Sequence, residues 1–251
     1  CTSLVTGANS GIGLALAQTL AAQGHTVLMA CRRAEACEDA RRAVLEHVRS
    51  AAASAEADHA LAGRVQALPG LDLASLPAVT KFVTETVGSR PAAIDYVFAN
   101  AGFVPVGNHS TPVGLEAGLG ASHFGHFHLV RSLRSAGAFK RGAAVVLVSS
   151  DASRLGAFHD SLMESPSGEG DLNGEYTVGC ETPFPFCLPP TRIEGLRKPL
   201  LGLPFGFGAY TRAKLANVLL ARRLAKDGEK KSGGFLFASS VHPGTVYTRL
   251  A

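Results

Sequence analysis

The chain has 251 residues, of which 46% are hydrophobic and 18% charged, with 24 Lys and Arg against 20 Asp and Glu. This length suits one large α/β domain or two small ones, and the composition is too apolar for an intrinsically disordered protein. The net charge of +4 comes without a dense basic block, so nucleic acid is not an expected partner. No apolar stretch approaches the ~18 residues of a membrane span, the longest strand-like run being Ala143 to Val148.

Cysteine and histidine give no sign of a disulfide framework or a metal site. The five cysteines form no CxxC pair, so we expect reduced thiols at Cys1, Cys31, Cys37, Cys180 and Cys187. Three histidines cluster, but their spacing places them on different helix faces without carboxylate or thiolate partners: His123, His126 and His128. Both ends of the chain look cut, so no targeting signal is readable and the compartment stays open.

Strands and helices alternate along the chain. Short apolar strands are predicted at 2–6, 25–30, 64–68, 94–99, 143–149 and 235–241. Helices are predicted at 11–23, 34–50, 76–87, 115–133 and 209–224. Uniformly apolar strands between helices are typical of a parallel sheet that is covered on both faces. The predicted fold is therefore one doubly wound, Rossmann-like α/β domain over residues 1–251.

Residues 155–208 interrupt this alternation. They hold seven of the 13 prolines, many glycines and little periodicity. Connections in α/β units usually take ~2–6 residues, so this segment is a long insert placed before the last predicted helix. It follows the carboxyl end of a strand, where such sheets bind ligands. Apolar anchors favour a lid or a docking surface for a protein partner over a plain surface loop: Phe184, Phe186, Phe205 and Phe207.

A glycine-rich turn, TGANSGIG over residues 6–13, joins the first predicted strand to the first helix. Glycines let the backbone turn tightly and approach a pyrophosphate, whose charge then sits at a helix N-terminus. Between a strand and a helix, this turn predicts dinucleotide binding. The residues expected to contact the cofactor here are Gly7, Asn9, Ser10, Gly11, Ile12 and Gly13.

The end of the second predicted strand indicates which dinucleotide is bound. Dehydrogenases that prefer NAD usually place an Asp or Glu there, against the ribose 2′-hydroxyl. This chain has Arg32 and Arg33 instead. Guanidinium groups bind phosphate in a bidentate manner, so the expected cofactor is NADP(H). Solvated surface arginines are the alternative interpretation.

Tyr210 and Lys214 are four residues apart at the start of a predicted helix, so they share one face. Tyrosine is a poor acid–base group at neutral pH unless a nearby cation favours its phenolate, and Lys214 is placed to do this. The motif follows the glycine turn and a strand that ends at Ser149 and Ser150. Together these features predict a catalytic site.

With these motifs the chain resembles the short-chain dehydrogenase/reductase family along essentially its whole length apart from the insert. The matching residues are the 6–13 turn, Asp72, Asn100-Ala101-Gly102, Ser150, Tyr210 with Lys214, Pro243-Gly244 and Thr248. Segments 29–32, 71–76, 214–219 and 242–244 look most like the retinol dehydrogenase and WW-domain oxidoreductase branch. Light-dependent protochlorophyllide reductases are less similar around Lys214 and residues 100–102.

The resemblance implies hydride transfer between NADP(H) and a lipophilic carbonyl or alcohol. It implies that Tyr210 is the general acid, that Lys214 binds the nicotinamide ribose and that Ser150 hydrogen-bonds the carbonyl oxygen. The further cofactor contacts that it implies are Asp72, Leu73, Asn100, Ala101, Gly102, Pro243, Gly244, Thr245 and Thr248.

One departure concerns the proton relay. The family pattern Asn-His-Leu-Gly-His-Phe is SHFGHF here, so Ser122 stands where the family's catalytic asparagine supports a water. Serine lacks the reach of the amide and its second polar atom. Two alternatives therefore stay open. One is a catalytically weakened subunit with a structural or binding role in a larger complex, and the other is a protochlorophyllide-reductase-like enzyme.

Assembly is the last expectation. Many family members pair through the helices that include the one carrying the tyrosine and lysine. The outer face of that predicted helix carries cations whose burial opposite symmetry mates would cost desolvation energy: Arg212, Arg222, Arg223 and Lys226. We therefore expect no homodimer of this kind, and an insert that folds over the cleft or contacts a different protein.

Overall fold

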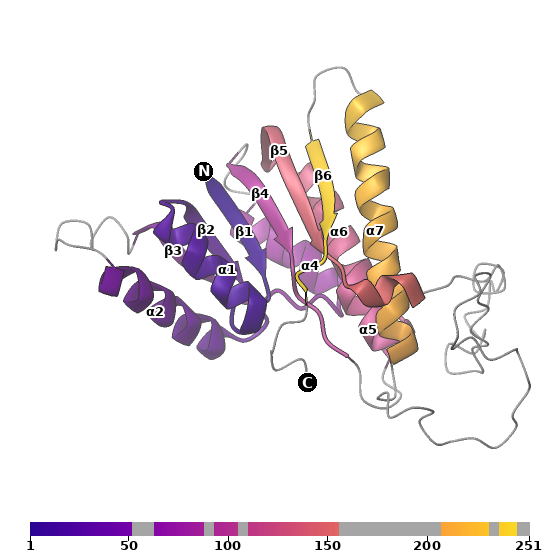
Figure 1. Cartoon of the computed structure of the whole chain (residues 1–251), viewed down its shortest axis with the longest axis horizontal. Helices are drawn as coiled ribbons and strands as arrows, with labels where there is room; N and C mark the ends of the chain where they lie inside the picture. The colour runs from indigo at the N-terminus through magenta and orange to yellow at the C-terminus, as the bar shows by residue number, and fades with distance from the viewer. Residues whose placement is uncertain (52–62, 88–92, 105–109, 156–206, 231–235, 245–251) are drawn as a thin grey trace, which may run out of the picture.

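The computed structural model describes residues 1–51, 63–87, 93–104, 110–155, 207–230 and 236–244 (Figure 1). The predicted insert lies almost wholly outside these ranges, so its expected role as a lid or docking surface stays a prediction. Thr245, Thr248, Cys180 and Cys187 also lie outside them. Within the described ranges no helix is long and apolar enough to cross a bilayer.

Six parallel strands form one sheet in the order β3-β2-β1-β4-β5-β6 (Figure 1). They are β1 (Thr2–Thr6), β2 (Thr26–Ala30), β3 (Val65–Leu68), β4 (Ile94–Ala99), β5 (Phe139–Val148) and β6 (Leu236–Val241). The predicted doubly wound parallel sheet is confirmed. The strand order reverses at β1 and β4, and α/β sheets bind ligands at such a switch point.

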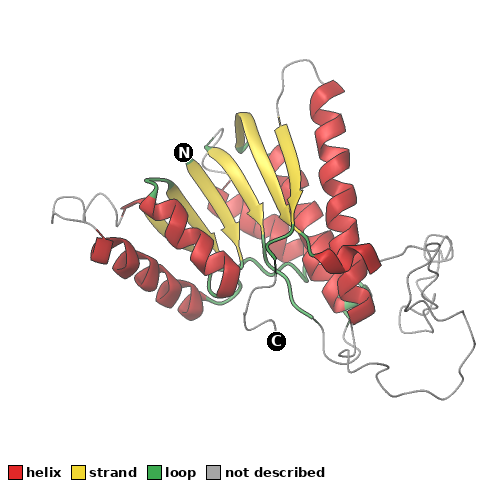
Figure 2. Cartoon of the chain, in the orientation of Figure 1, coloured by secondary structure: helices red, strands yellow, loops and turns green. Residues whose placement is uncertain are grey.

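Helices cover both faces of the sheet (Figure 2). One face packs against α1 (Gly11–Ala22) and α2 (Ala34–Ala51). The other packs against α4 (Leu76–Phe82), α6 (His126–Ser135) and α7 (Phe207–Lys230). Ser75 caps α4 by accepting a hydrogen bond from the Ala78 N–H at 3.4 Å.

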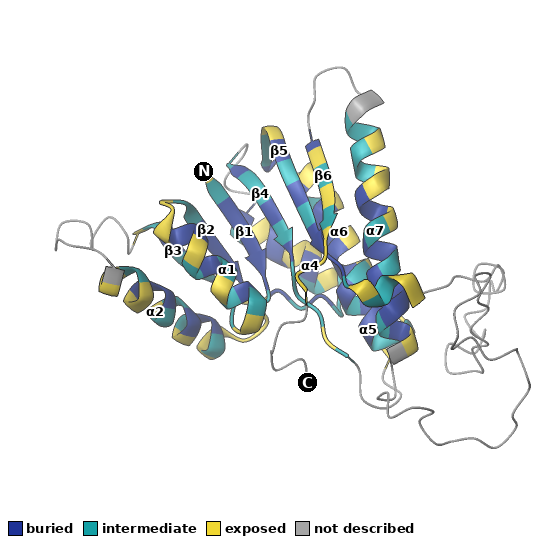
Figure 3. Ribbon diagram, in the orientation of Figure 1, coloured by how far each residue is buried: buried dark blue, intermediate teal, exposed yellow. Residues whose placement is uncertain are grey.

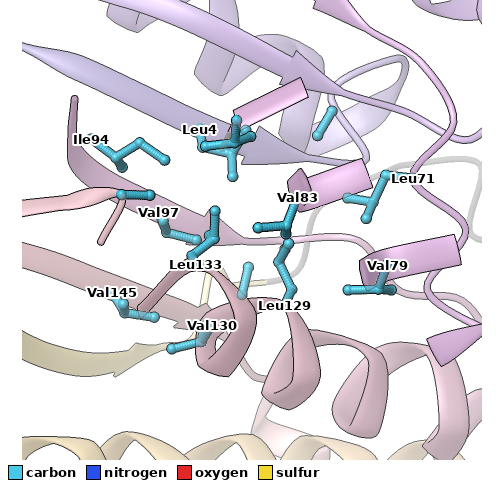
Figure 4. Close-up of a cluster of buried hydrophobic side chains, with 14 of the residues drawn as sticks. Leu4, Leu71, Val79, Val83, Ile94, Val97, Leu129, Val130, Leu133 and Val145 are labelled. Carbon is cyan, nitrogen blue, oxygen red and sulfur yellow. The ribbon is translucent and has the colours of Figure 1, made fainter. Parts of the chain in front are cut away.

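The strands are apolar on both sides because each side faces a layer of helices. Leu4 of β1 joins the core beneath α4, α6 and α7, whereas its neighbour Val5 joins the core beneath α1 and α2. Figure 3 shows the resulting buried stripe along the central strands. In the first core, Leu133 of α6 lies beside Val97 of β4, and Leu129 lies beside Val83 (Figure 4).

The predicted helix at 115–133 is three elements in the structure. It consists of α5 (Ala117–Leu119), the π-helical turn η2 (Gly120–Gly125) and α6. The predicted helix at 76–87 likewise ends in a π-helical segment, η1 (Val83–Val87). A π turn widens the helix and changes which carbonyl groups are bonded within it, and such turns are frequent at functional sites. Ser122 lies in η2.

Two sequence-based predictions are wrong. Cys31 and Cys37 form a disulfide, with their Cα atoms 5.6 Å apart, although reduced thiols are predicted. Cys31 follows β2 and Cys37 lies in the first part of α2, so the turn between these elements brings them together. Arg212 is only 7% exposed rather than on an open outer face, because α7 packs against α5 and the 3-10 helix η3 (Asp151–Leu155) as well as the sheet.

Candidate active site

A cleft of about 830 Å³ lies at the carboxyl ends of the strands. All six strands are parallel, so their carboxyl ends share this edge, and Figure 1 shows the arrows of β1, β4 and β6 pointing the same way. The predicted site residues that line it are Gly7, Asn9, Ser10, Gly11, Ile12, Arg32, Asp72, Leu73, Asn100, Ala101, Gly102, Ser122, Ser150, Tyr210, Lys214, Pro243 and Gly244. Gly13 and Arg33 are not among the lining residues, and Thr245 and Thr248 lie outside the described ranges.

The glycine turn packs closely against the loop that follows β4. Gly7 adopts a φ of 63°, in the left-handed region that favours glycine. A Cβ on Gly13 would lie 2.3 Å from the Gly7 carbonyl oxygen and 2.6 Å from Asn100 Nδ2. Asn100 Nδ2 donates to the Thr6 carbonyl at 2.9 Å. Gly13 is therefore needed for close packing behind the turn.

The N-terminus of α1 opens onto the cleft. Its first turn carries no acidic residue, and the N-cap residue Ser10 makes no side-chain capping hydrogen bond. Ser10, Gly11 and Ile12 all line the cleft. Unbonded N–H groups and the helix dipole attract an anion at such a position. This turn therefore fits the pyrophosphate of a dinucleotide.

A buried hydrogen-bond network connects β1 and the residues after β4, which form the floor of the cleft, to η2 and α6. His126 Nδ1 lies 2.9 Å from the Ser122 carbonyl oxygen, which can only accept, so Nδ1 carries the proton. The Thr6 hydroxyl then donates to Nε2 at 2.8 Å and accepts from the N–H groups of Asn100 and Ala101. Burial lowers the pKa of His126 from 6.5 to about 4, so the ring is neutral at pH 7.

Lys214 and Tyr210 meet at the other end of the cleft. Lys214 Nζ lies 5.4 Å from the centre of the Tyr210 ring and donates to the Val148 carbonyl at 3.0 Å. Lys214 is 4% exposed, and burial lowers its pKa from 10.5 to about 8. The group therefore stays mainly cationic at neutral pH.

Two serines border the same space. Ser150 Oγ accepts from the Ala152 N–H at 3.2 Å, which leaves its hydroxyl proton free to donate to a carbonyl oxygen in the cleft. Ser122 Oγ is buried and has no partner within the described part of the chain. A Cβ on Gly102 would lie 3.3 Å from Lys214 Nζ and 3.5 Å from Ser122 Oγ, so these two groups face one region.

Asn217 is a site residue that lies outside the motifs recognised in the sequence. Its Nδ2 donates to the carbonyl oxygens of Ser122 and Val148. Its position three residues after Lys214 and seven after Tyr210 places all three on one helix face. A lone amide in the apolar segment LANVLL is the signal that would have identified it.

Comparisons with known proteins agree with this geometry. Residues 2–162 match the family described as short chain dehydrogenase. The chain therefore belongs to the short-chain dehydrogenase/reductase family, whose members bind nicotinamide cofactors. Curated relatives place it near the predicted branch. It is 30% identical over 249 residues to human retinol dehydrogenase 14, and 31% identical over 247 residues to the WW domain-containing oxidoreductase of Gallus gallus.

The chain covers only part of these relatives. The match to the retinol dehydrogenase covers 99% of this chain and 62% of the relative. The match to the oxidoreductase covers 97% of this chain and 48% of the relative. Among solved structures, it is similar to an uncharacterized protein from Mycobacterium Paratuberculosis, with 27% identity, a TM-score of 0.66 and coverage of 97% of this chain and 68% of that one. A short-chain dehydrogenase from Burkholderia cenocepacia, solved with NADP, shares the fold with 20% identity and a TM-score of 0.61, over 99% of this chain and 75% of that one.

Proposed function

We propose that the chain is an NADP(H)-dependent oxidoreductase that transfers a hydride between nicotinamide and a lipophilic carbonyl or alcohol. The observation that carries this proposal is one cleft in which Tyr210, Lys214 and Ser150 lie together with the open N-terminus of α1. The cofactor supplies the hydride at nicotinamide C4 when it is bound. The residues of the chain supply the proton and the alignment.

In the direction of reduction, the hydroxyl groups of Ser150 and Tyr210 hydrogen-bond the carbonyl oxygen and polarise it. As the bound cofactor would supply hydride to the carbonyl carbon, the phenolic proton of Tyr210 moves to the carbonyl oxygen, giving the alcohol. Lys214 stabilises the phenolate that remains and would hold the ribose of the bound cofactor. In the reverse direction the same phenolate takes the proton of the alcohol.

The wall of the cleft supports a lipophilic substrate. Phe103, Ala117 and Ala121 line it, and Phe103 is exposed. Pockets that bind small molecules are mostly apolar, with a few polar groups that fix orientation. Here Ser150 and Tyr210 are those polar groups. An aldehyde or ketone fits this arrangement when its carbonyl oxygen meets the two hydroxyl groups and its hydrocarbon chain or ring meets the apolar wall.

We expect the purified protein to oxidise NADPH with at least one carbonyl from a panel of retinoid, steroid and aromatic compounds. Loss of NADPH absorbance measures the reaction. The controls are the same mixture without carbonyl and the same mixture with boiled protein. If NADPH binds but no compound across the panel is turned over, the proposal is refuted and a binding role without catalysis is favoured. Light-dependent turnover of protochlorophyllide would instead favour the photoenzyme.

We expect NADPH to bind ten- to a hundredfold more tightly than NADH, because a charge-assisted phosphate contact is worth roughly 1.5–3 kcal/mol. Arg32 lines the cleft where β2 ends, whereas its neighbour Arg33 does not. Arg32→Ala should therefore remove most of the preference, and the matched variant Arg33→Ala should retain most of it. The chain has no Trp, so cofactor fluorescence titrations measure both constants with little background. Equal constants for the two cofactors would contradict the assignment.

A further inference from the structure

Asn217 uses its whole side-chain amide inside the protein. It is 1% exposed and lies one turn after Lys214 on α7. Nδ2 donates to the Ser122 carbonyl at 3.2 Å and to the Val148 carbonyl at 3.4 Å. Oδ1 lies 3.1 Å from His123 Nδ1, and since Oδ1 can only accept, the histidine donates. His123 thereby fixes which end of the amide faces the two carbonyl groups.

These bonds join the three elements that carry the reacting groups. Ser122 belongs to η2, and Val148 ends β5 two residues before Ser150. Asn217 itself belongs to α7, which also carries Tyr210 and Lys214. One amide therefore sets the position of η2 and of the end of β5 relative to α7.

The Val148 carbonyl couples Asn217 directly to Lys214. It accepts from Lys214 Nζ at 3.0 Å as well as from Asn217 Nδ2. The Ser149 hydroxyl, next along the chain, donates to the Lys214 carbonyl at 2.7 Å. The Lys214 ammonium group therefore binds the end of β5 at a carbonyl group that Asn217 also binds. Without the Asn217 amide, we expect the Lys214 ammonium group to move towards the open cleft.

We propose that Asn217, oriented by His123, is the positioning residue that holds Ser122, Lys214 and Tyr210 in reactive alignment. This inference rests on the proposed function, because the alignment concerns proton transfer at Tyr210. Family members carry asparagine at the position of Ser122, whereas here a shorter side chain faces the cleft and an amide lies behind it. The alignment therefore depends on Asn217, which lies behind the residues that line the cleft.

The kinetic test compares four variants of the whole chain. Asn217→Leu removes the amide, and a misplacement of about 1 Å costs up to about a hundredfold in rate, so kcat should fall by about that factor. His123→Phe should lower kcat about tenfold. His123→Asn keeps a donor near the position of Nδ1 and should stay within about threefold of wild type. His128→Phe changes a histidine whose partner is Thr80, outside the cleft, and is the matched control.

The split between kcat and KM separates positioning from general damage. Each kcat is expressed per NADPH-binding site, so that unfolded protein does not count. KM for NADPH should rise by a smaller factor than kcat falls, because Lys214 supplies only one of the cofactor contacts. Wild-type kcat in Asn217→Leu and His123→Phe would overturn the inference. Equal losses in His123→Phe and His123→Asn would do so as well, because a donor at this position would then have no effect.

A second readout does not need turnover. Carbon NMR of lysine Cε follows the titration of Lys214, assigned by its absence in Lys214→Met. The titratable groups around it are Tyr210, His123 and His126, with Asp151 lining the same cleft. In His123→Phe the midpoint should rise towards the ordinary lysine value as the group gains access to water, and in His123→Asn it should not. If wild type turns over no carbonyl, the proposed function fails, and this comparison alone decides whether Asn217 and His123 position Lys214.

Discussion

Replacing Tyr210 with phenylalanine should lower kcat by about 10²–10⁴-fold, the usual contribution of a positioned acid–base group. The ring remains, so its contact with Lys214 Nζ, 5.4 Å from the ring centre, is retained. The phenolic proton is lost, and the alkoxide that forms on reduction has no donor at that position. The glycine turn and the N-terminus of α1 are unaffected. NADPH should therefore bind with nearly the wild-type constant.

Steady-state rates and NADPH fluorescence titrations of the same preparation test this expectation. Tyr96→Phe is a suitable control, because Tyr96 lies within β4 rather than at the cleft. It should leave kcat unchanged. A Tyr210→Phe protein that retains more than about a tenth of the wild-type kcat would show that another group or water delivers the proton.

Acid should destabilise the protein through His126, by about 2–3 kcal/mol between pH 7 and pH 4.5, a factor of about 10² in the unfolding constant. The pKa of His126 is about 4 in the folded chain against 6.5 as its ordinary value, and the side chain is fully buried. Between these pH values the unfolded chain binds the proton and the folded chain does not. Stability therefore rises with pH through this window and falls as the pH drops from 6.5 towards 4.

Protonation of His126 would also disturb the floor of the cleft. The Thr6 hydroxyl donates to Nε2. A proton on that nitrogen turns the hydroxyl proton to the Phe98 carbonyl, 3.3 Å away, and brings a third N–H onto the hydroxyl oxygen. Thr6 in turn accepts from the N–H groups of Asn100 and Ala101, which line the cleft. NADPH binding to the folded chain should therefore weaken only near pH 4, where the folded His126 itself takes up the proton, below most of the range in which stability is lost.

Urea unfolding of wild type and His126→Asn at pH 7 and pH 4.5 isolates this contribution. The variant has no titrating ring, and its amide can still donate to the Ser122 carbonyl. It should be less stable than wild type at pH 7, with the gap narrowing by about 2–3 kcal/mol at pH 4.5. A gap of the same size at both pH values would contradict the assigned cause. Carboxylates are common to both proteins and cancel in the difference.

The sequence determines the secondary structure and the chemistry of this protein to a large extent. Runs of Val, Leu and Ala of strand length, separated by amphipathic segments, can only be buried in a sheet with helices on both faces. Local spacing also places Tyr210 and Lys214 on one helix face, because four residues make about one helical turn. The glycine turn and Arg32 follow strands directly, so their position at the edge of the sheet follows from the chain order alone.

The tertiary structure alone decides how groups far apart in sequence meet. The hydrogen bonds of Asn217 to Ser122, and of His126 to Thr6, join residues 95 and 120 positions apart, and no local pattern specifies such contacts. The π turn at Gly120–Gly125 and the Cys31–Cys37 disulfide depend on how neighbouring elements approach, which residue spacing does not reveal. Burial of Arg212, and the low pKa values of Lys214 and His126, likewise arise from packing, because removal of water from a charged group exists only in the folded chain.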